Sequence, residues 1–75
     1  MSRTTEQANL FGVKCPLNWA KAKVRLEDLA RGDILEVLLD DPKGKRDIPR
    51  AAEAEGYVIV RIDEVVGGWC IAIEK

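Results

Sequence analysis

Histidine is absent from this 75-residue sequence, and cysteine occurs only twice, as Cys15 and Cys70. A four-ligand zinc site of cysteine and histidine cannot be built within one such chain, so we expect no metal site. The imidazole that most often serves as a general base is missing as well. Any thiolate in this protein must therefore be activated by a helix terminus and by lysine or arginine.

Long apolar runs are also missing, because no segment approaches the roughly 20 residues that a membrane-spanning helix needs. The polar residues 1–6 lack the apolar core of a signal peptide, so we expect a cytoplasmic protein with reduced thiols and no membrane association. Aromatic residues make up only 5% of the sequence, and the net charge is −1. Direct binding to nucleic acid is not expected, since it usually needs a basic face.

The remaining composition, 47% apolar and 33% charged residues, is typical of a globular chain. We expect residues 1–5 to form a disordered tail and residues 6–75 a single domain. Apolar periodicity and the positions of glycine and proline predict the elements of that domain. They are strands over 6–11, 33–40, 57–64 and 69–74, a helix over 16–29, and a short helix that opens around Asp47 and ends before Gly56.

This order predicts an α+β fold, a two-layer sandwich with the sequence β-α-β-α-β-β. Right-handed crossovers make the first three strands parallel, and a two-residue turn at Gly67-Gly68 makes the fourth antiparallel. The result is a mixed four-stranded sheet with both helices on one face. The second strand should be largely buried, with Leu35, Val37 and Leu39 on one side, although Ile34 and Leu38 soften the alternation. On the third strand Val58, Val60 and Ile62 are in phase, and Ile59 breaks the pattern.

Gly12-Val13-Lys14-Cys15-Pro16-Leu17-Asn18 is the stretch with visible chemistry, where the first strand passes into the first helix. Proline is favoured at the first helical position, which makes Pro16 that residue and Cys15 the N-cap. The amides of Leu17 and Asn18 should then point at the sulfur, and the helix dipole favours a thiolate. Lys14 adds a cation, and Gly12 allows the bend from strand to cap.

The first predicted helix has two apolar stripes. The core stripe comprises Trp19, Ala22, Leu26, Leu29 and Ala30, at helical spacing. Leu17, Ala20 and Val24 lie on a nearly opposite arc that begins beside Cys15. They either pack against the second helix or, with Arg46, form a docking site for a partner. Asp47 is interpreted as the cap of the second helix.

The chain resembles the TusA or SirA-like family of sulfur carriers over residues 7–75. The resemblance depends on the order and spacing of several motifs. They are Gly12-Val13-Lys14-Cys15-Pro16, Arg31-Gly32-Asp33-Ile34-Leu35-Glu36-Val37, Asp40-Asp41-Pro42, Arg46-Asp47-Ile48-Pro49 and Ile71-Ala72-Ile73-Glu74-Lys75. Cys15 matches the family's carrier cysteine. The family pattern is usually Cys-Pro-x-Pro, but Asn18 stands at the second proline here, and Asn9 stands where aspartate is common.

The resemblance implies a sulfurtransferase that carries sulfur as a Cys15 persulfide and needs no cofactor. Its partners would be a protein donor, a cysteine desulfurase or rhodanese, and an acceptor in tRNA thiolation, cofactor assembly or sulfur metabolism. We expect a monomer, with Cys70 as a structural residue rather than a resolving thiol. The alternative is a non-catalytic interaction or regulatory module, for example one that binds RNA, because fold alone does not give function.

Overall fold

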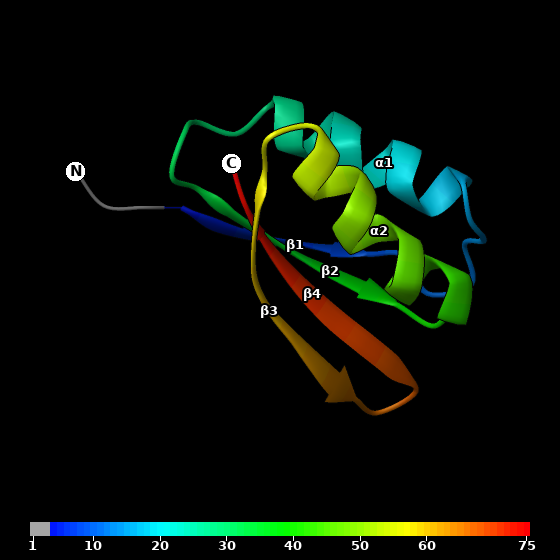
Figure 1. The fold of residues 1–75 in the computed structure, drawn as a ribbon. Helices are drawn as coiled ribbons and strands as arrows, with labels where there is room; N and C mark the ends of the chain where they lie inside the picture. The colour runs from blue at the N-terminus through cyan, green and yellow to red at the C-terminus, as the bar shows by residue number, and fades with distance from the viewer. Residues whose placement is uncertain (1–3) are drawn as a thin grey trace.

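The predicted order of elements is confirmed in the computed structural model, which describes residues 4–75 (Figure 1). The elements are β1 (Thr5–Asn9), α1 (Leu17–Glu27), β2 (Ile34–Leu39), α2 (Pro42–Ala54), β3 (Val58–Val65) and β4 (Gly68–Glu74). The predicted disordered tail is wrong at its end, because Thr5 is the first residue of β1. The part of that tail formed by residues 1–3 lies outside the described residues.

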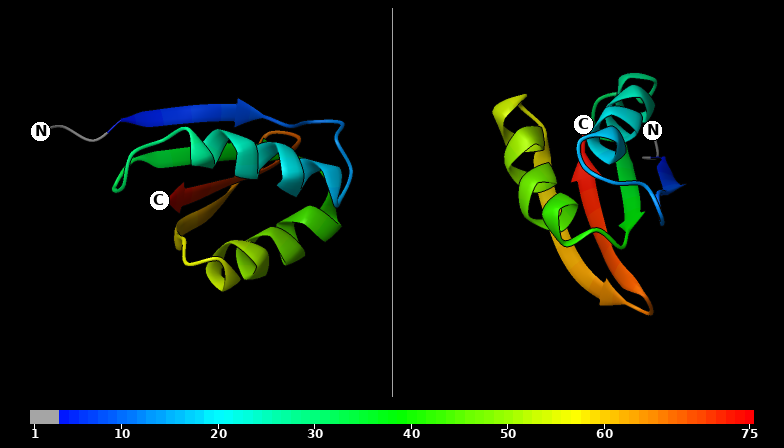
Figure 2. Two further views of the ribbon diagram at one scale, coloured as in Figure 1. Left: turned by 90° about the horizontal axis from the view of Figure 1, so that it is seen from above. Right: turned by 90° about the vertical axis from the view of Figure 1, so that its right-hand side faces the viewer.

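The sheet has the strand order β1-β2-β4-β3. β1 pairs with β2 in parallel, whereas β4 runs antiparallel to both β2 and β3. The first three strands therefore share one direction, as predicted, and β4 lies between β2 and β3. Both helices cover the same face of the sheet, which gives the predicted two-layer α+β sandwich (Figure 2).

The core lies between that face and the two helices. Leu35, Val37 and Leu39 of β2 are fully buried, as the alternation in the sequence predicts. Their side chains meet those of the neighbouring elements in one cluster, which contains Ala8 and Leu10, Ala22, Leu26 and Leu29, Ile48 and Ala52, and Ile71 and Ile73. The predicted core stripe of α1 is confirmed in its centre, but Trp19 is only half-buried and Ala30 is exposed.

The predicted alternation of β3 is wrong. Ile59 packs against the core cluster, whereas Val58 and Val60 are exposed. The cause is an irregularity in the pairing with β4, where the register shifts between Ile59 and Arg61. An extra residue in one strand interrupts the two-residue period that sequence alternation assumes.

The hairpin turn lies one residue earlier than predicted. Val66 and Gly67 form the turn, and Gly68 already belongs to β4, where it pairs with Val65. Gly67 has a φ of +86°, which glycine adopts without steric cost. Gly68 is needed for space, because a Cβ atom there would collide with the carbonyl oxygen of Leu39.

α2 is longer than predicted and begins five residues earlier than Asp47. Asp41 is its N-cap, and the Asp41 side chain accepts a hydrogen bond from the Lys43 amide. Pro42 follows at the start of the helix, where its missing N–H costs nothing. Asp47 is therefore not the cap, and Pro49 lies inside the helix. The predicted end before Gly56 is confirmed, with Gly56 at a φ of +91°.

Candidate functional site

Cys15 lies in the loop that joins β1 to α1, and its side chain is partly exposed. The prediction that Cys15 caps α1 is wrong. Pro16 occupies the N-cap position, with φ −93° and ψ 2°, and makes no side-chain capping hydrogen bond. The first helical residue is Leu17, and the Cys15–Pro16 peptide bond is cis. Cys15 therefore lies one residue before the N-cap, and not at the N-cap as the sequence predicts.

The predicted contact between the Asn18 amide and the sulfur is also absent. The Asn18 N–H donates to the Lys14 carbonyl oxygen over 3.1 Å. In the same turn, the Ala20 N–H donates to the Pro16 carbonyl oxygen. The carbonyl groups of Lys14 and Pro16 thus accept two of the donors in the first turn of α1. Stabilisation of a thiolate by Pro16, Leu17 and Lys14 stays a prediction.

The loop is held in place by Asp41, a residue of the Asp40-Asp41-Pro42 motif. The Cys15 N–H donates to Asp41 Oδ2 over 2.7 Å, and the Lys43 N–H donates to Oδ1 over 3.2 Å. The bond from Cys15 is the main cause that lowers the pKa of the largely buried Asp41 carboxyl. One side chain therefore links the Cys15 loop to the start of α2. In the sequence, the Asp41-Pro42 pair is the pattern that indicates a helix start at this point.

Gly12 confirms its predicted role at the bend, with a φ of +83°. Its N–H donates to Asp40 Oδ1 over 3.0 Å. The consecutive residues Asp40 and Asp41, directly after β2, thus bind two amides of the loop, at Gly12 and at Cys15. The loop is positioned by carboxylates from the neighbouring connection, which sequence spacing alone does not indicate.

Asn18 is fully buried, which makes it a packing residue rather than part of an exposed rim. Its Nδ2 donates to the Val13 carbonyl oxygen over 3.4 Å, and its Oδ1 accepts from the Trp19 N–H over 2.7 Å. A Cβ atom at Gly44 would collide with Asn18 Nδ2. The glycine in the first turn of α2 therefore lets the starts of the two helices approach each other.

Two cations lie within electrostatic range of the site. The pKa of Arg46 is raised, mainly by its 2.9 Å ion pair with Asp47 and to a smaller extent by electrostatic interaction with Cys15. The positive charge of Lys14 contributes to the lowered pKa of Asp41. Asp47, predicted as a cap, instead accepts from Arg46, and this contact lowers the pKa of its carboxyl.

The second apolar stripe of α1 does not pack against α2. Leu17 is 55% exposed, Val24 is 60% exposed, and Ala20 is exposed between them. Of the two interpretations that the sequence left open, packing against the second helix is therefore wrong. Docking of a partner stays a prediction. Arg46, the fourth residue of the predicted docking site, belongs to α2.

Cys70 differs from Cys15 in its surroundings. It is buried in β4, on the sheet face away from the helices, where it pairs with Leu38 and Asp63. Burial raises the pKa of the Cys70 thiol. A nucleophilic thiol needs access and an ionised sulfur. These features favour the structural role that the sequence predicts for Cys70.

No group of three or more potential metal ligands lies together among residues 4–75. Within the same described part, neither helix is long and apolar enough to cross a membrane.

The comparison with solved structures identifies the class of fold. A SirA-like protein from Desulfitobacterium hafniense superposes with a TM-score of 0.77, covering 92% of this chain and 93% of that chain. Its sequence identity is 24%, so this likeness concerns the fold alone.

The comparison with sequences identifies the family. The model of the family described as sulfurtransferase TusA matches residues 6–75. A putative sulfur carrier protein from Archaeoglobus fulgidus is 34% identical over 93% of this chain and 81% of its own length. The sulfur carrier protein TusA from Pseudomonas paraeruginosa is 33% identical over 85% of this chain and 81% of its own length. The chain therefore belongs to the TusA family of sulfurtransferases, as the sequence resemblance indicates.

Proposed function

We propose that this protein relays sulfur as a persulfide on Cys15, between a protein donor and a protein acceptor. The donor would be a cysteine desulfurase or a rhodanese. The main support for this proposal is that Cys15 is partly exposed and that its backbone N–H is bound by Asp41. Membership of a sulfurtransferase family supports it. The second thiol, Cys70, is buried and is a poor candidate.

In the loading step, the Cys15 thiolate attacks the outer sulfur of the donor's persulfide. The donor's S–S bond breaks, the donor leaves as a thiolate, and a new S–S bond forms on Cys15. In the unloading step, an acceptor thiolate attacks the terminal sulfur, and Cys15 leaves as the thiolate. The sulfane sulfur changes carrier without net oxidation, so the carrier itself requires no cofactor.

The residues around Cys15 would hold its backbone in position and supply positive charge near its sulfur. Asp41 fixes the backbone of Cys15 through its amide, so the sulfur is presented from a defined loop. Lys14 and Arg46 place positive charge near an anionic thiolate or persulfide. Cations close to a thiol favour its ionised, nucleophilic form.

The proposal is tested by loading the protein with a cysteine desulfurase, its pyridoxal phosphate and cysteine. Cyanide then releases sulfane sulfur as thiocyanate, which is measured by its iron complex. We expect about one thiocyanate per protein in the wild type and in Cys70→Ser, but a background amount in Cys15→Ser. Equal release from Cys15→Ser would contradict the proposal.

The alternative, a non-catalytic RNA-binding module, predicts a different result. It requires a complex with RNA that weakens steeply with salt and that Cys15→Ser leaves unchanged. Such a complex, together with background thiocyanate from the wild type, would replace sulfur relay by that function.

A further inference from the structure

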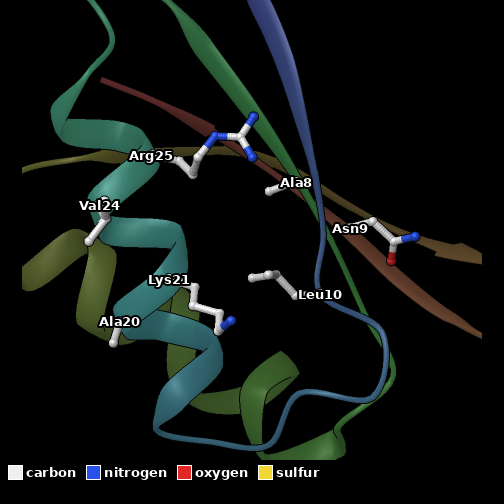
Figure 3. A pocket seen from close by; sticks show the side chains of 7 residues that line it. All are labelled: Ala8, Asn9, Leu10, Ala20, Lys21, Val24 and Arg25. Carbon is white, nitrogen blue, oxygen red and sulfur yellow. The ribbon is translucent and has the colours of Figure 1, made fainter.

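A groove of about 480 Å³ lies between β1 and the outer side of α1 (Figure 3). Its walls come from the end of β1 with the residue after it, and from the exposed turns of α1. The lining residues are Ala8, Asn9, Leu10, Ala20, Lys21, Val24 and Arg25. The groove therefore combines two residues of the exposed stripe of α1, Ala20 and Val24, with one edge of the sheet.

Among residues 4–75, β1 is the outermost strand on this side and pairs with β2 alone. The Leu10 N–H donates to the Leu38 carbonyl oxygen, and the Thr4 carbonyl oxygen accepts from the Ile34 N–H. The backbone N–H and C=O groups of the even-numbered residues of this segment therefore point toward β2. Alternate residues of a strand direct their backbone groups to opposite sides, which turns those of Gln7 and Asn9 away from the sheet. Arg25 Nη2 donates to the Gln7 carbonyl over 3.3 Å, but the Asn9 amide and carbonyl point outward.

The groove is basic at its helix wall and apolar beside it. Lys21 and Arg25 reach from α1 toward β1 in Figure 3. Arg25 pairs with Glu6 over 3.2 Å, whereas Lys21 makes no ion pair within residues 4–75. Val24, 60% exposed, supplies apolar surface in the same wall. An occupant that matches these features is extended, with apolar and acidic side chains.

We propose that this groove receives an extended acidic segment of a sulfur-relay partner, which adds to the sheet as a strand beside β1. Backbone hydrogen bonds to Asn9 would hold the segment, as in known cases of strand addition. Every second side chain would point to the helix side and fill the groove against Ala20 and Val24. Carboxylates would pair with Lys21. The identity of the partner rests on the proposed function.

This position places the partner close to the carrier thiol. The Asn9 end of the edge leads through residues 10–14 to Cys15, and α1 begins two residues after Cys15. A strand bound beside Asn9 therefore lies at the end of the groove from which the Cys15 loop departs. Docking and sulfur transfer would use adjacent surfaces.

The probe is an acetylated hexapeptide of alternating valine and glutamate, added to 15N-labelled protein. We use Cys15→Ala protein, so that sulfur chemistry plays no part. Shifted amide signals are expected at Gln7, Asn9 and the Ala20–Arg25 turns, with Kd on the order of 0.1–1 mM. A hexapeptide of alternating valine and lysine should bind at least about tenfold more weakly.

Three variants test the geometry. Asn9→Pro removes the outward amide without touching the ladder to β2, because proline is tolerated on edge strands. Lys21→Glu reverses a charge in the groove, and Val24→Glu adds a carboxylate there. Neither substitution changes a backbone hydrogen-bonding group. Each should weaken the glutamate peptide about tenfold or more. Val58→Glu is the matched control, an exposed valine on the opposite edge strand at 55% exposure, and should change nothing.

Failure of this inference is distinct from failure of the proposed function. Wild-type affinity in Lys21→Glu and Val24→Glu, or equal binding of the lysine peptide, would overturn the docking site while Cys15 still loads with sulfur. Peptide binding at the groove with no sulfur on Cys15 would uphold the docking site and overturn the relay.

Discussion

Asp41 connects the Cys15 loop to the start of α2. Its two carboxylate oxygens accept from the amides of Cys15 and Lys43, which belong to different segments. Both bonds favour the ionised carboxylate and lower the pKa of Asp41. The same side chain thus caps α2 and fixes the loop, so its protonation should loosen both together.

The pH dependence of stability tests this role. Because the pKa of Asp41 is lowered in the folded state, its stabilisation is present above the ordinary value of 3.8 and is lost as pH falls through the folded-state value. We expect Asp41→Asn to lower the urea midpoint at pH 7, and the difference from wild type to shrink below pH 3.8. The control is Glu53→Gln, an exposed carboxylate on α2. A difference that stays constant with pH would exclude this role.

Asn18 of α1 and Gly44 of α2 pack closely against each other. Asn18 is fully buried, and a side chain at Gly44 would meet both Asn18 Nδ2 and Leu39 Cδ1. Asn18 stands where the family usually has a second proline. The structure shows that the asparagine here faces α2 and the Val13 carbonyl, inside the fold.

Gly44→Ala separates packing from helix propensity. Propensity alone would stabilise the protein by roughly 0.5–1 kcal/mol, since glycine is unfavourable inside a helix. Overpacking against Asn18 predicts the opposite sign, a loss of about 1–3 kcal/mol in the free energy of unfolding. Urea unfolding measures the change. In an Asn18→Ala background the loss should become smaller, and identical losses in both backgrounds would argue against this contact.

At the scale of elements, α2 departs most from its prediction. Asp41-Pro42 is a helix start, but the glycine, the charges and the later proline at Pro49 resemble a turn followed by a short helix. Packing decides the matter, because Gly44 and Ile48 are buried on one side of the same helix. Burial of that side stabilises a helix whose internal proline would otherwise favour a break.

Amide hydrogen exchange tests where α2 begins. In a helix from Pro42, the amides of Arg46, Asp47 and Ile48 donate to carbonyls four residues earlier and should be protected from exchange. A charged turn over the same residues would leave them unprotected. We expect protection of Ile48 well above that of the exposed turn residue Val66, measured by NMR after transfer to D₂O. Exchange of Ile48 at the rate of Val66 would contradict the helix.

Elements with regular strand pairing could be predicted from sequence, and those altered by tertiary contacts could not. β2 buries alternate residues, and Leu35, Val37 and Leu39 could be placed on one side of it although Ile34 and Leu38 soften the alternation in the sequence. β3 contains an irregularity in its pairing with β4, which moves Ile59 into the core. At the site, Cys15 and Gly12 carry local signals. Asp41 binds across 26 positions in the sequence, a contact that no local pattern reveals.

At the scale of the molecule, the two faces of the sheet differ in what covers them. One face carries the helices and the core, while the other is covered partly by ion pairs of Arg61 with Glu36 and Asp63. Cys70 lies on the latter face and Cys15 in the loop between β1 and α1. The two thiols belong to separate parts of the fold, so a role for Cys70 in sulfur relay is not expected.

The location of sulfur in the loaded protein tests the relay on Cys15 most directly. After incubation with a cysteine desulfurase and cysteine, intact and peptide masses are recorded before and after reduction. We expect a reversible gain of about 32 Da on the peptide that contains Cys15 and no gain on the Cys70 peptide. A gain on the Cys70 peptide, or one that survives in Cys15→Ala, would contradict the relay on Cys15.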